Sequence, residues 1–110
     1  MQLTINGTKY DLYFGVRFVR ELDKIAGVDI QGASFGLGLT KSLLPLRSYD
    51  PAVLSDVLYA ATATDVQRPT RNEVDDFIDS GADLEPIFDQ VQKEMSEANA
   101  VKLATKNMKA

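Results

Sequence analysis

The chain of 110 residues contains neither cysteine nor histidine. Without cysteine it has no disulfide, thiolate zinc site or thiol nucleophile, and without histidine it lacks the commonest metal ligand and general base. An enzyme built from this sequence would depend on carboxylate, lysine, tyrosine or hydroxyl chemistry, or on a metal held by oxygen ligands. With no base or metal to activate such groups, we predict a protein that is not an enzyme and needs no cofactor.

Long apolar runs and an excess of positive charge are also missing. The apolar runs span only a few residues, whereas a membrane helix needs about 20, and the N-terminal segment lacks the basic and then apolar pattern of a signal peptide. The formal net charge is −4 at pH 7, which gives no overall attraction to nucleic acid or anionic lipid. We therefore expect no nucleic-acid partner, no membrane partner and a protein that stays in the cytosol.

Two local patterns that resemble binding motifs do not have the required spacing. The acidic residues between Glu73 and Glu85 are dense, but no D-x-D-x-D-G calcium loop is present. The glycines of GASFGLGL match neither the dinucleotide-binding motif nor the phosphate-binding P-loop. We interpret the acidic residues as a solvated helix surface and predict no metal site.

The first predicted element is a β-hairpin over residues 2–14. Apolar and polar residues alternate on both sides of Asn6-Gly7, and these two residues suit a type I′ turn because both tolerate positive φ. The side chains expected to face inward are those of Leu3, Ile5, Tyr10 and Leu12. A lone hairpin is marginal in water, so it must pack on the helices or pair with another copy, which leaves a homo-oligomer open.

Helical patterns account for most of the remaining chain. Residues 14–27 have an apolar stripe and end at a glycine, and we predict that this helix is the central packing element. Residues 28–33 are predicted to be a loop, with Ser34 as the cap of a helix that extends to Leu46. That helix is apolar on nearly all sides, so it is either buried or faces another protein.

Capping signals mark the last three predicted helices. Asp50 and Pro51 have the pattern of an N-cap and a first helical residue. Thr70 and Glu73 have the spacing of a capping box. Asp83 is expected to cap a long helix that runs to about residue 101.

The sequence as a whole indicates an α+β fold that is mainly α, with an N-terminal β-hairpin followed by four to five packed helices. Its 45% hydrophobic and 25% charged residues are ordinary for a soluble domain of this length. No repeat or linker divides it. We predict a single domain over residues 1–102 and a flexible, basic tail over residues 103–110.

Four stretches carry a resemblance to a known family: MQLTINGTKYDLYFGVRFVRELDKIAG, FGLGL, SYDPAVLSDVLYAAT and RPTRNEVDDFID. In the order and the residues of these stretches, the chain is similar to the tail assembly chaperones of long-tailed, siphovirus-type phages and prophages of Gram-positive bacteria. The resemblance implies a non-enzymatic chaperone that binds the tape measure protein, keeps it soluble and promotes tail tube polymerisation. It further implies action in the host cytoplasm, absence from the mature virion, and a longer frameshifted form that recruits the tail tube protein.

Such a chaperone would need an apolar groove for a partner helix. We predict that the groove lies between the segment that ends at Leu46 and the helix that begins at Pro51. The predicted partner-binding residues are Phe35, Leu39, Leu43, Leu46, Leu54 and Leu58. The alternative is a small helical DNA-binding regulator, but its candidate recognition helix carries Asp75, Asp76 and Asp79, where basic or amide side chains are needed.

Overall fold

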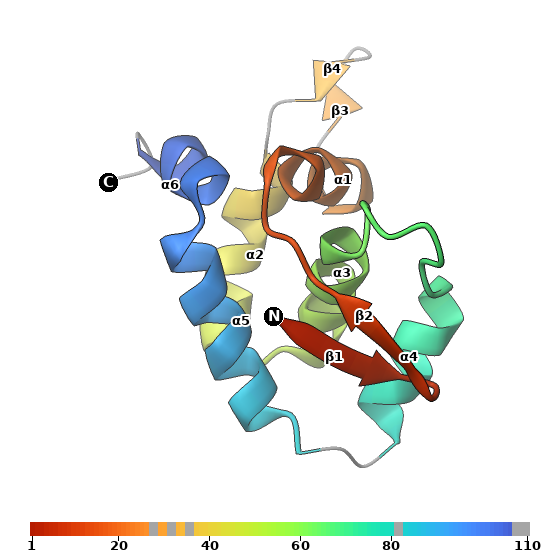
Figure 1. Cartoon of the computed structure of the whole chain (residues 1–110). Helices are drawn as coiled ribbons and strands as arrows, with labels where there is room; N and C mark the ends of the chain where they lie inside the picture. Colours follow the sequence, from red (N-terminus) through yellow and green to blue (C-terminus); the bar gives the residue numbers. More distant parts are fainter. Residues whose placement is uncertain (27–28, 31–32, 35–36, 81–82, 107–110) are drawn as a thin grey trace.

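Two short hairpins and six helices form the part of the chain that the computed structural model describes, namely residues 1–26, 29–30, 33–34, 37–80 and 83–106 (Figure 1). The strands are β1 (Gln2–Ile5), β2 (Thr8–Asp11), β3 (Asp29–Ile30) and β4 (Ala33–Ser34). The helices are α1 (Val16–Ala26), α2 (Leu37–Arg47), α3 (Pro51–Ala61), α4 (Arg71–Asp79), α5 (Glu85–Glu97) and α6 (Asn99–Thr105). The predicted class, mainly α with an N-terminal β-hairpin, is confirmed.

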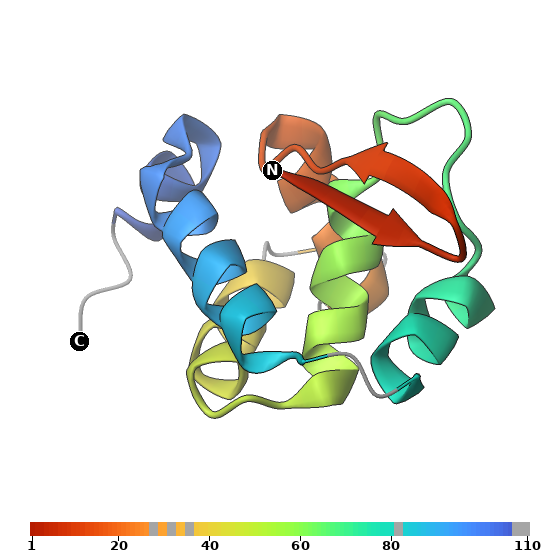
Figure 2. The same ribbon diagram turned by 60° about the horizontal axis from the view of Figure 1, so that its bottom comes forward.

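The β1–β2 hairpin forms around the predicted turn. Asn6 and Gly7 have φ values of 51° and 78°, as a type I′ turn requires, and the pairing of Leu3 with Tyr10 sets the antiparallel register. After β2, the N–H of Tyr13 donates to the carbonyl of Ala61 at 3.0 Å. The hairpin thus lies against α3 and α4 (Figure 2), with its apolar side in the core.

Helix α3 has more buried residues than any other described helix. Leu54, Val57 and Leu58 are all completely buried, and α1 packs on both α3 and α2. At the start of α3, Oδ1 of Asp50 accepts hydrogen bonds from the N–H groups of the second and third helical residues at 2.9 and 3.3 Å. The predicted cap is confirmed, and it fixes where α3 begins.

Helices α1 and α2 approach each other closely at Gly38. The N–H of Gly38 donates to Oδ1 of Asp23 at 3.0 Å, and Oγ of Ser42 donates to the Gly38 carbonyl at 2.7 Å. A Cβ atom at this position would lie 2.7 Å from the backbone carbon of Leu22 and 2.8 Å from Cα of Asp23. Glycine is therefore required by the packing of two backbones.

Tyr49 ends α2 in a conformation that usually belongs to glycine. Its φ is 59°, its N–H donates to the Leu46 carbonyl at 3.2 Å, and the next N–H, that of Asp50, donates to the Pro45 carbonyl at 3.0 Å. This pair of bonds is a Schellman motif. The left-handed backbone places the Tyr49 side chain on α5, where its hydroxyl donates to Asp89 at 3.0 Å.

Three details differ from the sequence-based predictions. Residues 29–30 and 33–34 pair as strands instead of forming a loop with Ser34 as a cap, because strands of two residues are too short to show a period in the sequence. The N-cap of α5 is Leu84, without a side-chain bond, and not Asp83. The long last helix breaks at Ala98, whose ψ of 130° is extended, so α6 is a separate helix that reaches Thr105.

The capping box of α4 is confirmed, and it is also tied to the β1–β2 turn. The N–H of Glu73 donates to Oγ1 of Thr70 at 3.1 Å, and the N–H of Thr70 donates to Glu73 at 3.0 Å. The side chain of Asn6 donates to the same carboxylate at 2.8 Å. The bond from the Thr70 backbone, followed by the bond from Asn6, holds the pKa of Glu73 below its ordinary value of 4.5.

This lowered pKa predicts a contribution of Glu73 to acid unfolding. Because the folded state favours the ionised carboxylate, its stabilisation is present above pH 4.5 and is lost as the pH falls through the lower folded pKa. Glu73→Gln keeps the capping geometry but removes the charge, so its free energy of unfolding should fall less steeply over this range. Urea unfolding at a series of pH values measures the difference.

Asn6→Gly is the matched variant, because glycine keeps the positive φ of the turn and removes only the amide donor. Its pH dependence should lie between those of the wild type and Glu73→Gln. Parallel curves for the wild type and Glu73→Gln would contradict the expected role of the carboxylate.

Candidate functional site

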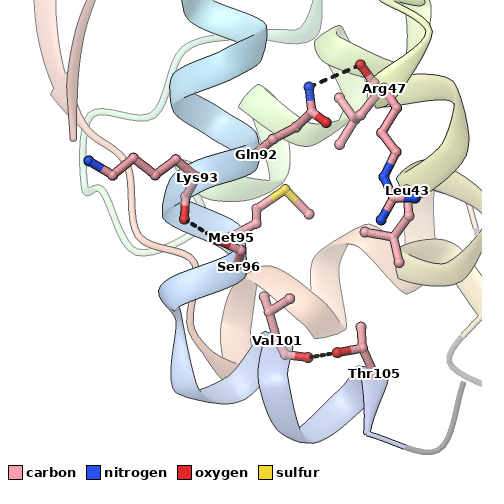
Figure 3. A pocket seen from close by; sticks show the side chains of 9 residues that line it. Leu43, Arg47, Gln92, Lys93, Met95, Ser96, Val101 and Thr105 are labelled. Atoms are coloured by element: carbon pink, nitrogen blue, oxygen red, sulfur yellow. Dashed lines mark hydrogen bonds between the residues drawn. The ribbon is translucent and has the colours of Figure 1, made fainter. Parts of the chain in front are cut away.

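A hollow of about 590 Å³ opens between α2, α5 and α6. Its apolar lining comes from Leu43 and Leu46 on α2, Met95 on α5 and Val101 on α6, and Figure 3 shows how these three helices surround it. The polar lining residues are Arg47, Gln92, Lys93, Ser96 and Thr105. An apolar floor with polar edges, between helices, is typical of a site that receives another molecule.

The two longer walls of the hollow are held together at one end. The side-chain nitrogen of Gln92 on α5 donates to the Leu46 carbonyl of α2 at 3.3 Å (Figure 3). Close by, the Tyr49 ring meets the Phe88 ring edge to face, with the ring centroids 5.1 Å apart. This separation lies within the range of about 4.5 to 7 Å that aromatic pairs prefer. The carboxylate of Asp89 raises the pKa of the Tyr49 hydroxyl, chiefly by accepting its hydrogen bond. These contacts set the spacing of α2 and α5.

The third wall, α6, is joined less firmly. It has seven residues, no side-chain cap at its N-terminus and one buried side chain, Val101. On its other side it borders a second hollow of about 360 Å³, which is lined by α1 and by Ala100 and Leu103 of α6. Leu103 is 65% exposed. Helix α6 therefore separates two partly apolar depressions.

The predicted partner-binding residues are divided between this hollow and the core. Leu43 is half-buried, Leu46 is buried, and both line the hollow. Leu39, Leu54 and Leu58 are buried inside the fold. Phe35 lies outside the described residues. The structure therefore brings two of the six predicted side chains to one concave surface.

Sequence reasoning missed the contributions of α5 and α6 to this surface. The sequence predicts a single long helix that runs to about residue 101, and its pattern does not show that Met95 and Val101 face α2 from two separate helices. Only the break at Ala98 turns Val101 back against α2 and α5. Arg47 was also missed, although it follows Leu43 by four residues and so shares its side of the helix.

The acidic side chains of the described residues form no metal site. No group of three or more acidic side chains there is placed to hold a metal ion. Several carboxylates have structural partners instead: Asp56 pairs with Arg71 at 2.6 Å, and Asp75 accepts a hydrogen bond from Ser55. Within the same residues, none of the helices is both long and apolar enough to cross a membrane.

Comparison with protein families gives a match over nearly the whole chain. A family model described as "Phage tail assembly chaperone protein, TAC" matches residues 2–109, which is nearly the whole chain. No curated protein and no solved structure matches it.

Proposed function

The chain belongs to the phage tail assembly chaperone family, and from this we propose that its client is the tape measure protein of a long-tailed, siphovirus-type phage or prophage of a Gram-positive host. In this role it binds the tape measure protein, keeps that long helical protein soluble and promotes polymerisation of the tail tube around it. A longer frameshifted form recruits the tail tube protein. The chaperone acts in the host cytoplasm and is absent from the mature virion.

The hollow between α2, α5 and α6 is the observation that supports a helical client. Helix-in-groove recognition needs an apolar channel between helices, and Leu43, Met95 and Val101 provide apolar surface of this kind. Leu44, next to Leu43 in the sequence, is 69% exposed and adds apolar surface to the same helix. A family of chaperones is not a class of enzymes, and the family match favours this role over that of a DNA-binding regulator.

Co-expression with the tape measure protein tests the proposed function. The wild-type chain should keep an affinity-tagged tape measure protein in the soluble fraction and co-purify with it. Leu43→Asp places a carboxylate on the floor of the hollow and should reduce the co-purified chaperone by roughly tenfold or more, as expected for a central interface residue. Quantitative gel analysis of the soluble and bound fractions measures both effects.

Two further variants make the result interpretable. Leu44→Asp changes an exposed residue and should weaken binding without affecting the fold. Val66→Asp changes a side chain that is 100% exposed in the segment between α3 and α4, far from the hollow in sequence, and should bind as the wild type does. A soluble, folded Leu43→Asp protein that binds normally would place the client elsewhere.

A further inference from the structure

The hollow lies on a basic side of an acidic protein. Helices α2 and α6 contain cations but no acidic residue: Lys41 and Arg47 are in α2, and Lys102 is in α6. Helix α5 does carry acidic residues, but none of them lines the hollow. Asp89 there accepts the Tyr49 hydrogen bond, and Glu94 pairs with the α-amino group of Met1 at 3.2 Å. The charged side chains that line the hollow are thus positive, although the net charge of the chain is −4.

Arg47 is the cation that lines the hollow from α2. Figure 3 shows its guanidinium group beside Leu43, on the α2 side of the hollow. Among the described residues it makes no ion pair, whereas Arg68 pairs with Glu21 and Arg71 with Asp56. Lys93 also borders the hollow, but its side chain extends to the opposite side of α5 (Figure 3). Arg47 is therefore an unpaired donor at the edge of an apolar surface.

We propose that this hollow binds an acidic amphipathic helix of the client, with an apolar side chain between Leu43 and Met95 and a neighbouring carboxylate paired with Arg47. The inference rests on the proposed function and specifies the chemistry of the client segment. Such a segment carries Asp or Glu three or four residues from its apolar anchor, because these positions share one side of a helix.

Physical reasons favour this occupant. A guanidinium group forms two parallel hydrogen bonds with a carboxylate, and it is more weakly hydrated than an ammonium group, so it pairs well at the edge of an apolar contact. The apolar floor supplies affinity by removing surface from water. The single charge then selects acidic helices over basic ones, since a client lysine at this point would face Arg47 and be repelled.

Charge reversal tests the inference in the full chain with the co-expressed tape measure protein. Arg47→Glu should lower co-purification by about tenfold, because it replaces attraction with repulsion. Arg47→Lys keeps a positive charge and should lose much less. Lys9→Glu is the matched control: it makes the same change in net charge at an exposed position of β2, which does not line the hollow, and should alter co-purification by no more than about twofold.

A charge swap in the client completes the experiment. Peptides of about 20 residues, which is five to six helical turns, are tiled along the tape measure protein to find the segment that the wild-type chain binds. An Asp or Glu beside its apolar stripe is then changed to Lys. This peptide should bind poorly to the wild type and regain binding to Arg47→Glu, which a merely structural role of Arg47 would not produce.

The possible failures are distinguishable. If the wild type and Lys9→Glu co-purify with the tape measure protein and Arg47→Glu does so equally, the acidic-helix inference is overturned and the chaperone role stands. The inference is also overturned if Arg47→Glu loses binding and no acidic-to-lysine change in the client peptide restores it. It is overturned as well if Arg47→Glu alters only self-association, because a second copy of the chain would then be the occupant of the hollow. If the wild type itself fails to co-purify, the proposed function falls and this inference with it.

Discussion

Leu39→Asp should leave the chain largely unfolded. Leu39 is 1% exposed on the side of α2 that faces the core, so the substitution removes a buried apolar side chain and leaves an unpaired carboxylate in its place. The first loss alone costs about 2 to 5 kcal/mol, and an unpaired buried charge adds several more. Since a domain is stable by about 5 to 15 kcal/mol, little folded protein should remain. Far-ultraviolet circular dichroism and gel filtration measure the outcome.

Leu44→Asp provides the control on the same helix. It makes the same chemical change five residues later, at a side chain that is 69% exposed, and should change the free energy of unfolding by about 0.5 kcal/mol or less. A folded Leu39→Asp protein with near-native stability would show that Leu39 is not in the core. It also follows that binding studies should alter Leu43 or Leu44 separately, without a change at Leu39.

Gly38→Ala should destabilise the protein by about 3 kcal/mol, although alanine is the better helix former by about 1 kcal/mol. The added methyl group would overlap the backbone of Leu22 and Asp23 in α1. A backbone cannot rotate aside as a side chain can, so α1 and α2 would have to separate, and the 3.0 Å bond from Gly38 N–H to Asp23 would weaken. Thermal unfolding should show a Tm lower by on the order of 10 °C.

Gly15→Ala is the corresponding substitution without a steric conflict. A Cβ atom at Gly15, just before α1, would meet no heavy atom within 4 Å. Because glycine at this N-cap position is replaced by a poorer capping residue, a loss of about 1 kcal/mol or less is expected. A Gly38→Ala protein as stable as Gly15→Ala, or more stable than the wild type, would contradict the close approach of α1 and α2.

Local sequence signals predicted the elements that depend on local geometry. Asn6-Gly7 fixed the hairpin turn, Asp50 capped α3, and Thr70 with Glu73 formed the capping box, because each of these interactions joins residues close in the chain. The break at Ala98 has no glycine or proline to mark it. It depends on where Val101 is buried, and that depends on the positions of α2 and α5.

The site was harder to predict than the fold for the same reason. Helical spacing showed that Leu39 and Leu43 lie near each other, but it did not show which of them faces the other helices and which borders a hollow. Gly38 gave a misleading signal, since its cost to helix formation is visible in the sequence and its value in packing against α1 is not. The relevance of Arg47 appears only once α6 lies across from α2.

The contacts that anchor the β1–β2 hairpin determine when it can fold during translation. Tyr13 is held by Ala61, and Asn6 is held by Glu73, 67 residues further along the chain. During synthesis, β1 and β2 leave the ribosome before Ala61 and Glu73 have been translated. The apolar side of the nascent hairpin therefore stays exposed to solvent until most of the chain has been translated.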